Sequence, residues 1–421
     1  MPWSLEKSGF KIFIFRLTLD LVCVTMIFEK ENNATKEKPM FEKLTRMLDA
    51  FIDNGTHGYD CVVYQDGKCV YRHMNGYSDA ERKISVCGDE LYYVYSCSKV
   101  ITVTAAMQLY ERGLFDLDDK LEKYIPEYKT MYVKNEQGEP TVAKNPITVR
   151  HLFTMTAGFS YALKNPAIKK FKEETRGKCP TREFARYMAD SVLDFEPGTR
   201  WQYSFCHDIL ASLVEIWSGE KFGEYVRKNI FEPAKMTNSS FYISPENYHK
   251  LAPQYKYDFS DKTIKPEKPT NCYDLGPEFE SGGAGCVTTV DDCIRFAEAL
   301  RVGKLLKDET LDLMSTNQIE HCMDSFWIER YAYGLGVRCS RGGDGITDIG
   351  WGGAAGAGIW IDRENKITAF YAQHVLSSPV IKKRNDIIFV IKEILGCGPV
   401  FALEGDEETT EKDKMRSSYG V

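Results

Sequence analysis

Apolar residues recur every three or four positions in several stretches of the chain, which is the spacing of a helix that buries one face. Together with capping residues and terminal glycines, this spacing predicts helices at 41–52, 96–112, 148–156, 209–217, 289–300 and 385–395, and another that begins near 180. Shorter apolar runs bounded by turn residues predict strands at 61–65, 68–72, 91–95, 333–339, 358–362 and 367–373. The dipeptide Asp66-Gly67 predicts that the first two strands form a hairpin.

The predicted strands lie near the two ends of the chain, whereas the middle is predicted to consist almost wholly of short helices and loops. This order favours an α/β (α+β) fold, in which a mostly antiparallel sheet is flanked by helices and carries a helical insertion domain. The sheet domain would be discontinuous, built from residues 40–95 and 285–400, and the mainly helical domain would span residues 96–284. We expect a substrate cleft between the two domains.

The composition is that of a weakly acidic globular protein. The chain has 421 residues, of which 43% are hydrophobic and 27% charged, and its net charge is −7. This length allows two or three domains. The acidic balance, without any run of lysine or arginine, argues against nucleic acid and anionic membrane surfaces. We therefore expect neither nucleic acid nor a stable membrane association among the partners.

The two ends of the chain differ from the rest. Residues 10–28 are apolar but interrupted by Lys11, Arg16 and Asp20, so they match neither a membrane-spanning helix nor a typical export signal. We predict that residues 1–39 are a poorly structured extension and that the polar residues 401–421 are a disordered tail. An exported form remains open if the N-terminal segment acts as a signal.

The cysteines and histidines predict neither a metal site nor a disulfide framework. The 13 cysteines are an odd number, include no CxxC pair and form no cluster with histidine at zinc spacing. Cys61 and Cys69 could face each other across the hairpin, but cysteine usage as a whole favours reduced thiols and hence the cytoplasm. We expect no metal and no cofactor.

Ser96 and Lys99 are three positions apart at the start of the predicted helix 96–112, so their side chains lie on one face. A serine hydroxyl becomes a nucleophile when a base removes its proton, and lysine can be that base only when it is neutral. Burial and the positive end of a helix both disfavour the ammonium and would bring the pKa of Lys99 to roughly 7–8. The backbone N–H of Ser96 would point at a developing oxyanion. By itself, the spacing is also consistent with a helix cap beside a solvated lysine.

Two further segments offer groups that such a serine needs. Tyr203 follows the turn at Pro197-Gly198 and precedes a helix, a position from which its hydroxyl could relay a proton. The segment Gly350-Trp351-Gly352-Gly353-Ala354 precedes a predicted strand, and its glycines allow a substrate to approach a free backbone N–H. Taken singly, an ordinary half-buried tyrosine and a core tryptophan at a bend explain these segments as well.

In this order the three motifs resemble those of the penicillin-recognising serine hydrolases, which include class C β-lactamases, penicillin-binding proteins and family VIII carboxylesterases. Further matching stretches between residues 40 and 395 are 109–114, Asp118-Asp119, 147–158, Ser218-Gly219, 233–236, 281–285 and 333–336. The resemblance implies that Ser96 is the acylated nucleophile and Lys99 its general base. It also implies that Tyr203 assists acylation and activates the deacylating water. The oxyanion hole would be the backbone N–H groups of Ser96 and Ala354.

Two departures from the β-lactamase pattern bear on the substrate. Phe205 stands where these enzymes usually have the asparagine of Tyr-x-Asn, and Trp351-Gly352-Gly353 stands where they usually have Lys-Thr-Gly. The lysine and the asparagine would bind a carboxylate and a side-chain amide of the substrate, and losing a charge-assisted contact costs on the order of 2 kcal/mol. The resemblance therefore implies a substrate pocket, lined by Phe205, Trp351, Gly352 and Gly353, that favours neutral, apolar acyl groups.

We expect a serine hydrolase that works through an acyl-enzyme, and specifically a carboxylesterase that acts on small neutral esters. A β-lactamase, a D-amino-acid peptidase or carboxypeptidase acting on an amide, an acyltransferase, and a non-catalytic binding protein of the same fold remain alternatives. Ser98 and His207 lie beside the proposed site residues in the sequence. We expect a packing role for Ser98, because adjacent helical residues do not face each other, and a helix-capping or surface role for His207.

Overall fold

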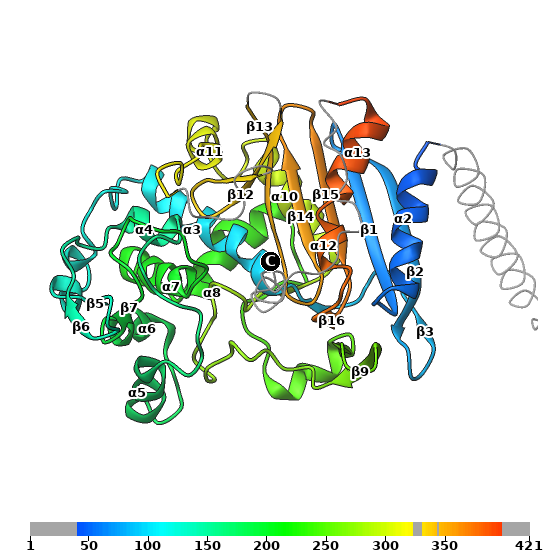
Figure 1. Cartoon of the computed structure of the whole chain (residues 1–421). Coiled ribbons are helices and arrows are strands. Elements are labelled where there is room, and N and C mark those ends of the chain that lie inside the picture. The colour runs from blue at the N-terminus through cyan, green and yellow to red at the C-terminus, as the bar shows by residue number, and fades with distance from the viewer. Residues whose placement is uncertain (1–39, 323–330, 343–344, 398–421) are drawn as a thin grey trace, which may run out of the picture. The chain divides into compact units, whose positions relative to one another are not determined.

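The structure is a computed structural model that describes residues 40–322, 331–342 and 345–397 (Figure 1). The predicted N-terminal extension and C-terminal tail lie outside these residues. Contacts divide the chain into one unit that ends at Leu48 and a second unit from Asp49 onward. Helix α2 (Glu42–Asp53) crosses this boundary and corresponds to the helix predicted at 41–52.

An eight-stranded antiparallel sheet brings early and late segments of the second unit together. Its strand order is β11-β12-β13-β14-β15-β1-β2-β3. The strands are β1 (Gly58–Gln65), β2 (Lys68–Asp79), β3 (Ile84–Ser85), β11 (Tyr331–Tyr333), β12 (Arg338–Gly342), β13 (Gly345–Gly352), β14 (Gly358–Asp362) and β15 (Ile367–Ala372). Strand β1 pairs with β15, so that Cys61 lies opposite Tyr371. The prediction of a mostly antiparallel sheet assembled from both ends of the folded chain is confirmed.

The hairpin between β1 and β2 forms where its turn signal predicts it. Asp66 and Gly67 have φ values of 50° and 75°, and a two-residue turn with positive φ at both positions matches the twist of the strands. The resulting register places Tyr64 opposite Cys69 and His73 opposite Cys61. The two cysteines therefore do not face each other, and every cysteine that the structure describes is a free thiol.

Several helices belong to the sheet region. They are α10 (Val290–Arg301), α11 (Asp308–Ser315), α12 (Ile381–Arg384) and α13 (Ile387–Leu395). The side chain of Thr289 accepts the N–H of Asp292 at 3.2 Å and so caps α10, as predicted. Helix α13 is tied to the sheet because Lys392 forms 3.0 Å ion pairs with both Asp348 of β13 and Asp362 of β14.

The middle of the chain is mostly helical, as predicted. Its helices are α3 (Ser98–Glu111), α4 (Val149–Phe153), α5 (Pro166–Glu174), α6 (Thr181–Met188), α7 (Cys206–Ser218), α8 (Phe222–Val226) and α9 (Glu232–Ala234). Three small sheets accompany the helices: β10 (Val287–Thr288) with β4 (Tyr92–Tyr93); β16 (Val375–Leu376), β8 (Gln254–Asp258) and β9 (Thr263–Glu267); and β6 (Pro140–Val142), β5 (Tyr132–Lys134) and β7 (Val192–Leu193). The division of the chain into a sheet domain and a helical domain at residues 95/96 and 284/285 remains a prediction.

Two predicted elements differ from the structure, and one strand of the large sheet was not predicted. The strand predicted at 333–339 is wrong as one piece, because a turn containing Gly336, with φ of 77°, separates β11 from β12. Strand β13 was not predicted, because its glycines and polar residues obscure the apolar alternation. The helix predicted at 148–156 ends earlier, at Phe153, and Met155 has a φ of 57° that no helix allows.

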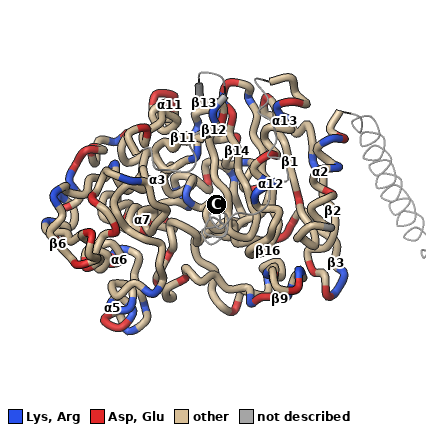
Figure 2. The backbone as a smooth tube through the Cα atoms, in the orientation of Figure 1, with Lys and Arg blue, Asp and Glu red and all other residues tan. Residues whose placement is uncertain are grey.

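Charged residues of both signs are interspersed along the described trace (Figure 2). None of the helices within the described ranges is long and apolar enough to cross a membrane. One apolar cluster includes residues of α3, α7 and the large sheet, and both Tyr203 and Trp351 belong to it. The predicted site residues therefore come from elements that share a core.

Candidate active site

Ser96 lies in a single 3-10 turn, η1 (Tyr95–Cys97), directly before helix α3. We predicted that Ser96 and Lys99 share the first turn of one helix. In the structure α3 begins two residues later, at Ser98, so Lys99 lies in its first turn and Ser96 lies in the 3-10 turn before it. Tyr95 has a φ of 45°, an uncommon conformation for a tyrosine. Its hydroxyl donates a 2.6 Å hydrogen bond to Oε1 of Gln254, which helps to hold the turn. The backbone before the serine is thus held in a strained conformation, as is frequent at functional sites.

Ser98 has the packing role that we predicted. Its hydroxyl donates to the carbonyl of Tyr95 at 2.5 Å and accepts the N–H of Cys286 at 2.9 Å. These two bonds connect the start of α3 to the segment that leads into β10. Ser98 is fully buried, and its hydroxyl is already engaged as a donor and as an acceptor, so it is not an alternative nucleophile to Ser96.

Lys99 is fully buried beside the serine. Its Nζ lies 2.7 Å from the carbonyl oxygen of Gly283, 3.3 Å from Oγ of Ser96 and 3.4 Å from the hydroxyl of Tyr161. Burial lowers the pKa of Lys99 to about 7, while the carboxyl of Asp208 acts in the opposite direction. A large fraction of the amine is therefore neutral near pH 7 and can accept the proton of Ser96.

Tyr203 approaches the same serine from the segment before α7. Its hydroxyl donates to Oγ of Ser96 at 2.6 Å, and Nε1 of Trp351 lies 3.4 Å from the Tyr203 oxygen. The rings of Tyr203 and Trp351 are stacked, with centroids 5.7 Å apart and planes at 13°. Burial raises the pKa of Tyr203 far above its ordinary range, so the phenol is protonated. The structure thus brings the amine of Lys99 and the hydroxyl of Tyr203 within hydrogen-bonding distance of Oγ of Ser96, and Nζ of Lys99 lies 4.5 Å from the centre of the Tyr203 ring.

The segment after β13 forms a tight turn beside the site. The N–H of Gly353 donates to the carbonyl of Ala357 at 2.7 Å. A Cβ at Gly353 would lie 2.3 Å from the carbonyl oxygen of Val94, and the space at Gly352 is filled by the guanidinium of Arg384. These glycines are therefore required by protein packing, which is a different reason from the close approach of a substrate that we expected.

The two predicted oxyanion donors have unoccupied N–H groups. Among the described residues, neither Ser96 nor Ala354 donates its backbone N–H to a backbone oxygen. Ala354 lies in the Gly353–Ala357 turn and packs against the cluster that contains Tyr95, the residue before the serine. Their joint action as an oxyanion hole remains a prediction.

A family model described as Beta-lactamase matches residues 42–389, which is most of the chain. The chain belongs to the beta-lactamase family. Among its relatives, Esterase EstB of Burkholderia gladioli is 28% identical over 293 residues, which are 64% of this chain and 73% of that esterase. Acyltransferase calJ of Penicillium decumbens is 28% identical over 348 residues, which are 73% of this chain and 81% of that protein.

A solved structure shows a similar fold. EstCE1, described as a hydrolase with promiscuous acyltransferase activity, has a TM-score of 0.68 at 21% identity, and the match covers 86% of this chain and 99% of EstCE1. Together with the family membership and the esterase relative, this likeness confirms the interpretation of the sequence as a serine hydrolase related to β-lactamases.

Tyr161 is a site residue of this beta-lactamase family member that sequence reasoning missed. Its hydroxyl lies 3.4 Å from Nζ of Lys99. Its ring stacks on Phe205 with centroids 4.5 Å apart and contacts the ring of Tyr273 at 4.6 Å with the planes tilted by 44°. Phe205, which we expected to line the substrate pocket, is fully buried against Tyr161. Any influence of Phe205 on a substrate would therefore act through the position of the Tyr161 side chain. No motif marked Tyr161, because the matching stretch 147–158 ends just before it.

Arg384 is a second residue that the sequence did not reveal. Its guanidinium is buried and donates to the carbonyls of Gly353 at 3.0 Å and Ala357 at 2.8 Å. Both carbonyls belong to the turn that carries Ala354. Arg384 therefore fixes the turn that would supply the second oxyanion donor.

His207 does not lie at the surface. It is fully buried on α7, where Nε2 lies 3.4 Å from the carbonyl oxygen of Phe153. The expected surface role is therefore wrong, because α4 packs against α7. The helix-capping alternative is not contradicted, because Phe153 is the last residue of α4 and its carbonyl lies at the end of that helix. Burial lowers the pKa of His207 to about 3, so the imidazole is neutral and does not contribute a charge to the site.

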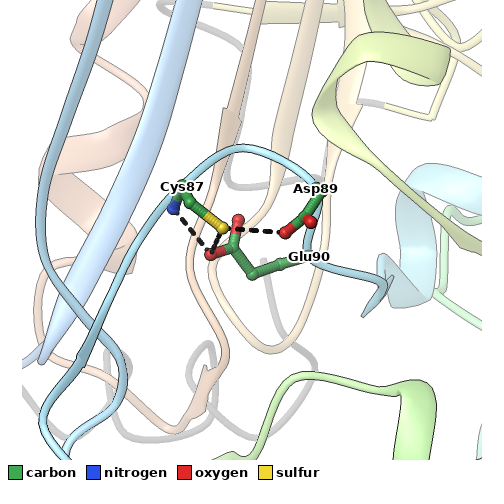
Figure 3. Close-up of side chains that lie close together, drawn as sticks. All are labelled: Cys87, Asp89 and Glu90. Carbon is green, nitrogen blue, oxygen red and sulfur yellow. Dashed lines mark hydrogen bonds between the residues drawn. The ribbon is translucent and has the colours of Figure 1, made fainter. Parts of the chain in front are cut away.

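Cys87, Asp89 and Glu90 lie close together in the loop before β4 (Figure 3). The Glu90 carboxylate accepts the N–H groups of Cys87 and Gly88, each at 2.8 Å. The thiol of Cys87 donates to Asp89, and this bond raises the pKa of Cys87 to about 11. These groups are satisfied by the loop itself, and we assign no ligand to them.

Proposed function

We propose that this member of the beta-lactamase family is a carboxylesterase that acts on small neutral esters through an acyl-enzyme at Ser96. One observation carries the proposal: a single serine oxygen lies 2.6 Å from a protonated phenol and 3.3 Å from a buried amine. Such an oxygen can lose its proton to the amine while the phenol supplies a proton elsewhere. No cofactor is required for this chemistry.

Acylation would use the three side chains as follows. Oγ of Ser96 attacks the ester carbonyl carbon and its proton passes to Nζ of Lys99, while the carbonyl electron pair moves onto oxygen. The N–H groups of Ser96 and Ala354 would bind this oxyanion. When this electron pair re-forms the carbonyl, the bond to the leaving oxygen breaks. The departing alkoxide takes a proton from the Tyr203 hydroxyl. Tyr203 then recovers a proton from the Lys99 ammonium. The products are an alcohol and a neutral acyl-enzyme.

Deacylation would reverse these roles with water as the nucleophile. As the water oxygen attacks the acyl carbon, water gives up a proton, which is relayed through the Tyr203 hydroxyl to Nζ of Lys99. The bond to Oγ of Ser96 then breaks, and Oγ takes a proton from the Lys99 ammonium, which returns to the neutral amine. The net reaction is an ester plus water giving an acid plus an alcohol, with the enzyme unchanged.

The absence of a lysine at position 351 supports neutral esters over β-lactams. Trp351 occupies the place of the lysine that would attract a carboxylate, and its indole is committed to Tyr203. A carboxylate substrate would lose a charge-assisted bond of about 2 kcal/mol, roughly thirtyfold in affinity. An ester without a negative charge loses nothing.

Acyl transfer to an alcohol is the second candidate, because a relative over 73% of the chain is named an acyltransferase. The same acyl-enzyme would serve, with an alcohol in place of the deacylating water. The cytoplasmic location remains a prediction from the cysteine usage.

The deciding experiment compares substrates on one enzyme. Initial rates are measured with short-chain p-nitrophenyl esters and with nitrocefin, on the wild type and on Ser96→Ala. We expect ester turnover to exceed nitrocefin turnover by orders of magnitude and to disappear in Ser96→Ala. Wild-type rates in Ser96→Ala would reject the proposal, and nitrocefin rates equal to the ester rates would replace it with a β-lactamase. Added primary alcohols that yield a transfer ester in excess of the acid would favour the acyltransferase.

A further inference from the structure

A buried carboxylate and the buried amine of Lys99 are joined through one glycine. Asp208, on α7, is fully buried, and its Oδ1 accepts the hydroxyl of Ser281 at 2.6 Å and the N–H of Gly283 at 3.1 Å. The carbonyl of the same glycine accepts Nζ of Lys99 at 2.7 Å. The position of Gly283, and with it the position of the amine, therefore depends on Asp208.

The packing around this glycine leaves no freedom. A Cβ at Gly283 would lie 2.5 Å from Oδ2 of Asp208 and 2.7 Å from the hydroxyl of Tyr161. Within the described part of the chain, Oδ2 of Asp208 has no hydrogen-bond partner. A buried carboxylate oxygen without a donor is costly, and a nearby positive charge offsets that cost.

The charges that surround Lys99 single out this carboxylate. The titratable groups that face Lys99 in the structure are Cys97, Tyr161, Tyr203, Cys206, His207 and Asp208. Burial raises the pKa of each of the two thiols to about 12 and raises the pKa of both phenols above their ordinary range. The imidazole is neutral, because burial lowers its pKa to about 3. Burial also raises the pKa of Asp208, whereas Lys99 and the hydrogen bonds from Ser281 and Gly283 lower it. Among these described groups, a carboxyl is the only one whose ordinary pKa lies below neutral, so Asp208 is the group that can face the ammonium with a negative charge.

We propose that Asp208 is a positioning residue for the base: it fixes Lys99 through Gly283, and its charge stabilises the ammonium that forms when Lys99 accepts the Ser96 proton. This inference rests on the proposed function, in which Lys99 is that base. The acylation transition state places a positive charge on Nζ, so a fixed negative charge nearby lowers the barrier. No bond to Asp208 forms or breaks, and its proton count does not change.

The test is Asp208→Asn, which removes the charge and keeps the size of the side chain. Without the carboxylate, the ammonium of Lys99 is disfavoured, so the pKa of Lys99 falls. The acid limb of kcat/KM for a p-nitrophenyl ester should then move to lower pH by about one unit. The plateau of kcat above this limb should fall by about 10- to 100-fold, because the transition-state ammonium has lost its counter-charge.

Two controls separate this role from a structural one. Asp292→Asn changes another buried carboxylate, which accepts the N–H of Asn238, pairs with Arg295 and bonds neither Gly283 nor Lys99 within the described part of the chain. It should leave the acid limb and the plateau unchanged once the folded fraction is measured by thermal melting. Ser281→Ala retains the charge of Asp208 but removes one of its donors, so the charge is less neutralised by hydrogen bonds and favours the Lys99 ammonium more; the limb should move by a smaller amount in the opposite direction, to higher pH. This variant also decides the question if Asp208→Asn does not fold.

A folded Asp208→Asn whose acid limb stays at the wild-type pH would overturn the inference, even if its kcat falls, because loss of packing alone does not shift the limb. Ser96→Ala, measured in parallel, distinguishes the two levels. If Ser96→Ala is active, the proposed function fails. If Ser96→Ala is inactive and the limb of Asp208→Asn is unmoved, the assignment of Asp208 fails alone.

Discussion

The hydroxyl of Tyr203 donates a 2.6 Å hydrogen bond to Oγ of Ser96, across 107 positions of sequence. Because burial keeps this phenol protonated, it occupies one lone pair of the serine oxygen in the resting enzyme. The serine's own proton is then free to point toward Nζ of Lys99, which is 3.3 Å away. This relationship orients the nucleophile before a substrate arrives.

Replacing Tyr203 by phenylalanine should remove the proton donor for the leaving group while retaining the ring that stacks on Trp351. We expect kcat for p-nitrophenyl esters to fall by about 100- to 10,000-fold, the range of general acid–base catalysis. The loss should be larger for alkyl esters, because an alkoxide needs a proton on leaving and p-nitrophenolate does not. Steady-state kinetics on the two ester types measures the difference.

Tyr128→Phe is a matched control for that variant. Tyr128 is also buried, and its hydroxyl donates to the carbonyl of Ala185 at 2.8 Å, away from Ser96. Its loss should lower thermal stability and leave kcat within a few-fold of the wild type. Equal activity of the two tyrosine variants would contradict the role of Tyr203.

The pH dependence of the enzyme should report Lys99. The base acts when neutral, and burial lowers its pKa to about 7, so kcat/KM should rise about tenfold per unit below pH 7 and level off above it. A histidine base at His207 would give no such limb near 7, since burial lowers the pKa of that imidazole to about 3. A flat profile from pH 5 to 9 would contradict a lysine base.

Arg384→Met should impair the turn that carries Ala354. The variant removes the donors to the carbonyls of Gly353 and Ala357 and keeps an apolar side chain in the space of the arginine. If the N–H of Ala354 loses its position, kcat should fall by about 10- to 100-fold with little change in KM. Stability should also fall by about 1–3 kcal/mol, because each of the two carbonyls loses its hydrogen bond to the guanidinium and keeps only a backbone N–H donor.

Arg363→Met serves as the control for the arginine variant. Arg363 pairs with Asp308 and Asp312, both of which are well exposed. Exposed ion pairs contribute about 0–1 kcal/mol, so both stability and kcat should remain near wild type. An unchanged kcat in Arg384→Met would show that the turn does not need this anchor.

Local signals in the sequence were sufficient where the structure depends on a few neighbouring residues. Thr148 and Thr289 cap their helices as predicted, and Asp66-Gly67 forms its hairpin. Strand β13 escaped prediction because pairing with β12 and β14, rather than its own apolar pattern, makes it a strand. The cost of burying the carboxylate of Asp348 is offset by its ion pairs with Arg338 and Lys392, which no local pattern reveals.

The same distinction applies to the site. Motifs and spacing pointed to Ser96, Lys99 and Tyr203, and the fold brings their functional atoms together. Three further residues make contacts that are distant in the sequence. Tyr161 lies 62 positions from Lys99, Asp208 lies 75 from Gly283, and Arg384 lies 31 from Gly353. No spacing rule connects these residues to the serine. Their roles follow from which helices and turns pack against the site, so they could be found only in three dimensions.

The central claim is that Ser96 is the nucleophile and that a neutral Lys99 activates it, and an irreversible label tests it most directly. The folded, active enzyme is treated with a fluorophosphonate at several pH values, digested, and mapped by peptide mass spectrometry. The account predicts one label, on the peptide that contains Ser96, with a rate that rises through about pH 7 and is lost in Lys99→Met. A label on another residue, or an active enzyme in which Ser96 stays unlabelled, would contradict it.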